Sequence, residues 1–154
     1  MGLDCMPRHF DPVTHEIDHD EPHPGRTHAS DETCPFAHDD FPIGIAGTCC
    51  SLRGKGAAHE LEALGEADLA EAMYEDMDSD QAGAFADRLT GAADRLERTF
   101  AGKPKPRGAA WNRIEGGDVR EVRSSFDESV AEIRLAARWY EKVSKLGYGV
   151  HAWY

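Results

Sequence analysis

Apolar residues recur at helical spacing after residue 45, and this pattern predicts a largely helical protein. The clearest stretch opens at Ser79 or Asp80 and ends near Phe100, before a segment that contains one glycine and two prolines. Its apolar positions alternate in steps of four and three, as expected for one face of a helix. They are Phe85, Leu89, Ala92, Leu96 and Phe100. This spacing predicts a helix whose apolar face packs into the core.

A second long helix is predicted from Ser125 to Leu146, since Ser125 and Glu128 have the spacing of a capping box. Two shorter helices are predicted upstream, from about Thr48 to Leu64 and from Glu66 to Met77. The segment Trp111 to Val122 contains two adjacent glycines and is expected to be a hairpin or a loop.

The two ends of the chain differ from this helical middle. Six of the eight histidines and six of the eight prolines precede residue 45, where apolar residues are too sparse to form a stripe. The last six residues, from Gly149, are rich in aromatic side chains and are expected to pack back on the helices. We therefore predict a mainly α fold: about four helices in a small bundle at 41–154, an irregular acidic leader at 1–40, and an aromatic C-terminal tail.

Charge adds information about the surroundings in which this fold works. The chain has 29 acidic and 17 basic residues among 154, a formal net charge of -12, and only five of the basic residues are lysine. Such a surface suits high salt, where self-repulsion is screened, and indicates a halophilic source. No apolar run is long enough to span a membrane, and the acidic start lacks the basic charge of a signal peptide. We expect a host-cell cytoplasmic protein with no membrane association, and a place in a virion stays open.

Two stretches without any acidic residue, 41–59 and 98–114, are exceptions in this acidic chain. They predict a basic surface for a phosphate-bearing, nucleotide-like anion, in which aromatic rings would stack a base. The candidate ligand-binding residues are Arg53, Lys55, His59, Arg107, Trp111 and Arg113. The alternative is that these cations pair with acids on other helices and form no site.

Histidines and cysteines suggest a zinc site as a second alternative. His15, Glu16 and His19 fit the His-Glu-x-x-His pattern, in which two histidines bind zinc and the glutamate polarises a water molecule. Cys34 and His38, one helical turn apart, would instead form a closed structural site that Cys49 or Cys50 and another histidine complete. Zinc is therefore the candidate cofactor, in a structural role or in a hydrolase.

Three blocks carry a resemblance: FPIGIAGTCCSLRGKGAAHELEALG at 41–65, RGAAWN at 107–112 and ARWYEKVSKLGYGVHAWY at 137–154. They resemble uncharacterised small proteins of halophilic archaea and their viruses or proviruses. The order of the helices is more distantly similar to that of small helical accessory proteins of tailed phages. The resemblance implies a virus-related accessory protein, and it carries over no catalytic residue.

These observations lead us to expect a non-enzymatic binding protein. Its basic surface would hold a phosphate-bearing ligand or a protein partner. A zinc protein and an oligomeric virion or scaffold component are the alternatives.

Overall fold

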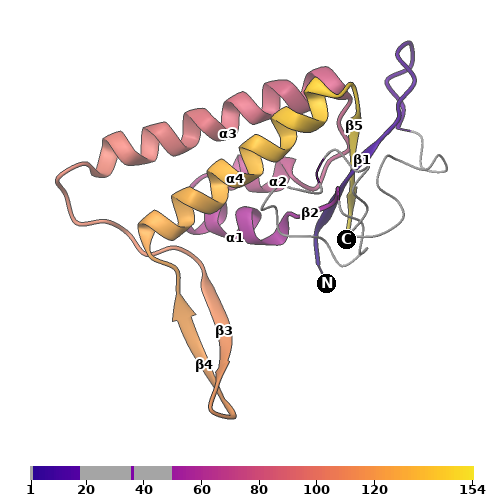
Figure 1. The fold of residues 1–154 in the computed structure, drawn as a ribbon. Coiled ribbons are helices and arrows are strands. Elements are labelled where there is room, and N and C mark those ends of the chain that lie inside the picture. The colour runs from indigo at the N-terminus through magenta and orange to yellow at the C-terminus, as the bar shows by residue number, and fades with distance from the viewer. Residues whose placement is uncertain (1, 18–35, 37–49) are drawn as a thin grey trace.

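The computed structural model describes residues 2–17, 36 and 50–154. In chain order the elements are β1 (Asp4–Arg8), β2 (Leu52–Arg53), α1 (Lys55–Ala63), α2 (Ala67–Ala72), α3 (Ser79–Phe100), β3 (Ala110–Glu115), β4 (Asp118–Arg123), α4 (Phe126–Lys145) and β5 (Gly149–Trp153). Figure 1 shows α3 and α4 crossing each other above the two short helices. No helix in the described ranges is long and apolar enough to cross a membrane.

The predicted mainly helical bundle is wrong, because the helices are combined with two small antiparallel sheets. Helices make up 47% and strands 22% of the residues that the structure describes. One sheet has the strand order β2-β1-β5, and the other is the hairpin of β3 and β4. The fold is therefore mixed α and β, with a sheet at one end of the helix pair.

Strand β1 also corrects the prediction of an irregular N-terminal segment. It is the central strand of its sheet, where Asp4 pairs with both Arg53 and Trp153. Four of its five residues are buried, so both faces are covered and the sequence shows no alternation of apolar and polar positions. Pro7, which has no N–H to donate, lies beyond the two residues that pair with β2.

The first predicted helix begins later than expected. Leu52 and Arg53 form strand β2, and α1 starts only at Lys55, so a helix over residues 50–54 is wrong. Pairing of Leu52 with Cys5 in β1 overrides the helical pattern there. The second predicted helix is shorter than expected, since α2 ends at Ala72 and Met77 bridges to Val150.

The two long helices confirm their predictions. Helix α3 has a capping box made by Asp78 and Gln81, and α4 has the predicted one made by Ser125 and Glu128. Between the two helices Phe85 packs edge-on against Tyr140, with ring centroids 4.8 Å apart. This pair lies in the core, where nearly every apolar position of both helices is buried.

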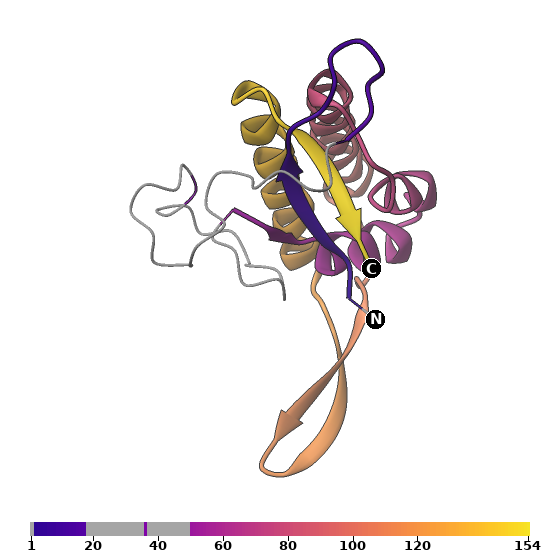
Figure 2. The ribbon, with the colours of Figure 1, turned by 90° about the vertical axis from the view of Figure 1, so that its right-hand side faces the viewer.

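The aromatic tail was expected to pack on the helices, but it forms strand β5 along β1, with Val150 buried and Trp153 and Tyr154 52% and 64% exposed. The hairpin of β3 and β4, joined by Gly116 and Gly117, projects away from the rest of the protein at the end of the helices opposite this sheet (Figures 1 and 2). We call residues 110–123 the hairpin arm. Almost all of its side chains are exposed, and its root lies where α1 approaches the start of α4.

Candidate functional site

The carboxylate of Glu60 on α1 connects the root of the hairpin arm to two helices. Its Oε2 accepts hydrogen bonds from the Ala109 N–H and the Ser129 hydroxyl, both at 2.7 Å. Its Oε1 accepts from the Trp111 indole N–H at 3.0 Å and from the Ser124 hydroxyl at 2.5 Å. Only 3% of Glu60 is exposed, so four donors replace the water that this charge would otherwise bind.

These bonds keep Glu60 ionised. Burial acts to raise the pKa of Glu60, but the hydrogen bonds from Ser124, Ala109, Ser129 and Trp111 together outweigh it and hold the pKa below its ordinary value. A carboxylate with both oxygens occupied by donors has little capacity left to accept a proton from a substrate. Glu60 therefore acts as an anchor for the hairpin arm.

Gly108 lies against the Glu60 carboxylate, in a space that no larger residue could occupy. A Cβ atom at Gly108 would collide with the Ser129 hydroxyl and with Oε2 of Glu60. The Gly108 N–H also donates to the Ser124 carbonyl at 2.9 Å, which closes the base of the ladder between β3 and β4. Glycine at residue 108 thus allows the backbone to approach the buried charge closely.

A second carboxylate, Glu132 on α4, lies in the same region, and its pKa is shifted in the opposite direction. The pKa of Glu132 is raised. Burial is the larger cause, and the nearby negative charge of Glu60 is the smaller one. Glu132 forms no hydrogen bond within the described part of the chain, and a Cβ atom at Gly56 would lie 2.6 Å from its Oε1. Two carboxylates with opposite pKa shifts can divide acid and base roles, but here the ionised one is already saturated with donors.

Two open cavities lie at the root of the hairpin arm, and Trp111 lines one of them. Its ring stacks on His59, with centroids 5.1 Å apart and an interplanar angle of 24°. One cavity, of about 330 Å³, is lined by His59, Glu62, Arg123 and residues 108–110. The other, of about 320 Å³, is lined by Trp111 and Arg113 together with the carboxylates of Glu60, Glu128 and Glu132. Acidic side chains thus line both cavities beside the cations.

The hairpin arm beyond its root carries an ordered arrangement of side chains. Arg113 lies directly opposite Arg120 on one face, and Glu115 lies opposite Asp118 next to the turn. On the other face Ile114 lies opposite Val119, and these side chains are 76% and 66% exposed. Neither arginine forms an ion pair within the part of the chain that the structure describes.

The structure gathers some of the residues predicted to bind an anion and separates others. His59, Trp111 and Arg113 meet at the root of the hairpin arm. The pKa of Glu128 is lowered mainly by its hydrogen bonds with Ser125, and the charges of Arg113 and Arg107 add smaller contributions. Arg53 pairs with Asp4 in the three-stranded sheet, and Lys55 begins α1 with its N–H on the Leu3 carbonyl. Arg53 and Lys55 line neither cavity at the root.

Most of the predicted zinc ligands fall outside the described residues, namely His19, Cys34, His38 and Cys49. Cys50 is described and fully buried, and its carbonyl accepts a hydrogen bond from the Trp139 indole at 2.9 Å. Among the described residues no group of three or more histidines, cysteines and acids could hold a metal ion.

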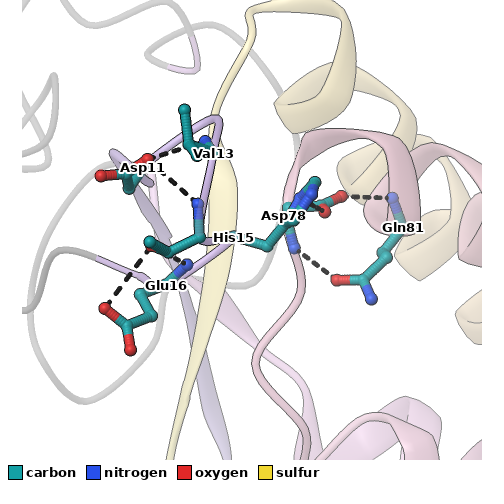
Figure 3. Close-up of polar contacts among 7 residues, drawn as sticks. Asp11, Val13, His15, Glu16, Asp78 and Gln81 are labelled. Carbon is teal, nitrogen blue, oxygen red and sulfur yellow. Dashed lines mark hydrogen bonds and ion pairs between the residues drawn. The ribbon is translucent and has the colours of Figure 1, made fainter.

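His15, the other described zinc candidate, contacts the start of α3. Its Nδ1 lies 2.7 Å from Oδ2 of Asp78, whose Oδ1 accepts the Gln81 N–H in the capping box (Figure 3). His15 has a backbone φ of 62°, within a turn in which Asp11 accepts the N–H groups of Val13 and Thr14. This turn thereby joins the loop after β1 to helix α3.

Sequence reasoning missed the anchor. Glu60, Ser124 and Ser129 were not among the candidates, because an acidic residue in a helix is usually exposed. A signal was present: Glu60 follows Ala57 by three residues and precedes Leu64 by four, so helical periodicity places it on the apolar face.

No family model, curated protein or solved structure matches this chain.

Proposed function

We propose that this chain is a non-enzymatic binding protein that docks onto a protein partner through the hairpin arm. The observation that carries this proposal is the pair formed by Ile114 and Val119. Two large apolar side chains lie side by side near the tip of a projecting element, 76% and 66% exposed. Adjacent apolar groups on a projecting element favour contact with another molecule, whereas single exposed apolar residues are common.

The construction of the hairpin arm supports the same proposal. A two-stranded hairpin is marginally stable in water without further packing. The Glu60 anchor holds its root against α1 and α4, so the strands can project without a third strand. Among the residues that the structure describes, no third strand pairs with either outer edge, and such edges commonly pair with another strand.

Site-specific photocrosslinking tests this proposal. A photoreactive benzophenone amino acid in place of Ile114 is expected to form an adduct with a second polypeptide in the host cell. The matched control carries the same group in place of Thr90, which is exposed on α3. Equal adduct yields at the two positions would contradict docking through the hairpin arm.

The root of the hairpin arm favours a second function, binding of a nucleotide-like anion. The supporting observation is the stack of His59 on Trp111 beside Arg113, which offers an aromatic surface and a cation to one ligand. Titration with adenosine monophosphate, followed by isothermal titration calorimetry, is expected to show saturable binding that is lost in the Arg107→Ala/Arg113→Ala variant. Arg53→Ala, a control outside the root, should titrate like the wild type. If the wild type shows no saturable response, this function is rejected.

A further inference from the structure

We infer that the protein partner is a second copy of this chain, paired antiparallel along the outer edge of β3. This inference rests on the proposed docking role of the hairpin arm and specifies its partner. The two arms would form one four-stranded sheet in the order β4-β3-β3-β4, about a two-fold axis at Ile114.

The turn determines which backbone groups of β3 are free. Gly116 and Gly117 have φ values of 59° and 90°, as a two-residue type I′ turn requires. Glu115 and Asp118 flank this turn, so they form the hydrogen-bonded pair that closes it. Hydrogen-bonded and non-bonded pairs alternate along an antiparallel ladder, so the N–H and C=O of Ile114 point outward from the hairpin. Ile114 can therefore exchange both backbone hydrogen bonds with Ile114 of a second copy.

This register matches opposite charges. With Ile114 opposite its own equivalent, Arg113 of each copy lies opposite Glu115 of the other. The triplet Arg113-Ile114-Glu115 is thus complementary to itself when it runs antiparallel. Directly opposite positions have Cβ atoms about 5 Å apart, within reach of an ion pair. A closed two-fold pair satisfies both triplets at once, as expected of an isologous dimer.

The same register joins the exposed apolar groups. Ile114 and Val119 are neighbours within one hairpin arm and lie on the face opposite the arginines. Pairing along β3 would place Val119, Ile114 and their two equivalents in one row across four strands, with about 4.8 Å between neighbouring strands. Each exposed apolar side chain in the row would gain or keep an apolar neighbour.

Strand β3 is favoured over β4 because it is less protected against pairing. Charged side chains at a sheet edge discourage pairing with another strand. Strand β4 has four charged residues among six, whereas β3 has two, and those two are the complementary Arg113 and Glu115.

The projection of the hairpin arm also reduces the electrostatic cost of association. Each chain has a net charge of -12, so close approach of the two bodies would be repulsive. The four steps along the strand from Ala110 to Ile114 span roughly 13 Å, which keeps the two roots about 26 Å apart. That separation is about three times the Debye length of 8 Å at physiological ionic strength.

Charge exchange within β3 tests the register, with sedimentation equilibrium of the purified chain over a wide concentration range as the measurement. The wild type is expected to show a reversible monomer–dimer equilibrium. Arg113→Glu and Glu115→Arg, each alone, are expected to weaken the dimer about tenfold or more, because like charges would then face each other. The double variant Arg113→Glu/Glu115→Arg restores opposite charges and should return to within about threefold of the wild type.

Arg120→Glu is the matched control, since it makes the same charge change at the same level of the hairpin arm on the outer strand. It is expected to weaken the dimer by less than about threefold. A monomeric wild type, a double variant that stays dissociated, or a larger effect of Arg120→Glu than of Arg113→Glu would each overturn the inference. If the purified chain is monomeric while a probe at Ile114 still crosslinks to a different protein, the docking function stands and the self-association falls.

Discussion

Glu60 shows how one residue can determine the position of an exposed element. Its carboxylate is buried and accepts hydrogen bonds from Ala109 and Ser124, which flank the hairpin arm, and from Ser129 on α4. A buried charge is tolerated only when its hydrogen-bonding capacity is filled, and here four donors fill it. The anchor is therefore sensitive to loss of its charge.

We expect Glu60→Gln to lower the free energy of unfolding by about 2–4 kcal/mol, because an amide accepts at one end only and leaves buried donors unpaired. Urea denaturation measures this loss. Glu62→Gln, on the exposed side of the same helix, is the matched control and should change stability by less than about 0.5 kcal/mol. Equal effects of the two variants would contradict the role of Glu60 as an anchor.

Because the pKa of Glu60 is lowered in the folded protein, the loss of stability in Glu60→Gln should depend on pH. The folded-state pKa is lowered, so its contribution is present above the unfolded-state pKa and is lost as the pH falls through the folded-state value. The difference between the wild type and Glu60→Gln should therefore shrink in acid.

Glu132 is expected to behave in the opposite way. Its folded-state pKa is raised, so ionisation costs stability as the pH rises from the unfolded-state value through the folded-state value. Glu132→Gln should stabilise the protein at neutral pH, by less than about 1 kcal/mol because the half-buried side chain is partly screened by water. Thermal unfolding at neutral and acid pH measures the difference, which should disappear in acid. Destabilisation at neutral pH would reject this account.

At the scale of elements, the hairpin arm should be separable from the stability of the fold. Its strands beyond Asn112 contact little else, as their exposure shows. Replacing 112–121 by two glycines puts the new turn on the hydrogen-bonded pair Trp111 and Val122, and it keeps Ser124 and the Glu60 anchor. We expect this variant to unfold within about 1 kcal/mol of the wild type, because few buried groups are lost. Chemical denaturation measures the change, and a loss of several kcal/mol would show that the strands stabilise the fold.

The sequence predicted the long helices well and the strands poorly. Helices α3 and α4 have more than five turns each, with apolar residues on one face and a capping box at the start. Strands β1 and β2 are short, and β1 is covered on both faces, so neither gave a periodic signal.

The candidate site was predicted only in part for a related reason. Local sequence placed His59, Trp111 and Arg113 in basic stretches, and the fold brings these three together. Local sequence gave no information that Glu60, Glu128 and Glu132 would line the same root, because those contacts join elements far apart in the chain. The two segments without acidic residues therefore fold into a surface that acidic residues from other segments also line.

At the scale of the whole molecule, the net charge of -12 predicts a dependence of stability on salt. Added salt shortens the Debye length from about 10 Å at 0.1 M to about 3 Å at 1 M and screens the self-repulsion of the folded chain. We expect the midpoint of thermal unfolding to rise by several degrees from 0.1 M to 1 M KCl. Equal ionic strength with sodium chloride is the control, and a midpoint that falls with either salt would contradict the expectation.

The central position of β1 has a consequence for synthesis on the ribosome. β1 is made first, but its long partner β5 is made after all the helices, so nascent chains that end before Gly149 cannot complete the sheet. In the folded protein burial raises the pKa of the Cys5 thiol to about 12 and makes it unreactive. Stalled chains that end at Tyr148 should therefore be alkylated at Cys5, whereas released full-length chains should be protected. Peptide mass spectrometry would measure this difference, and equal labelling would indicate that β1 is buried before β5 is available.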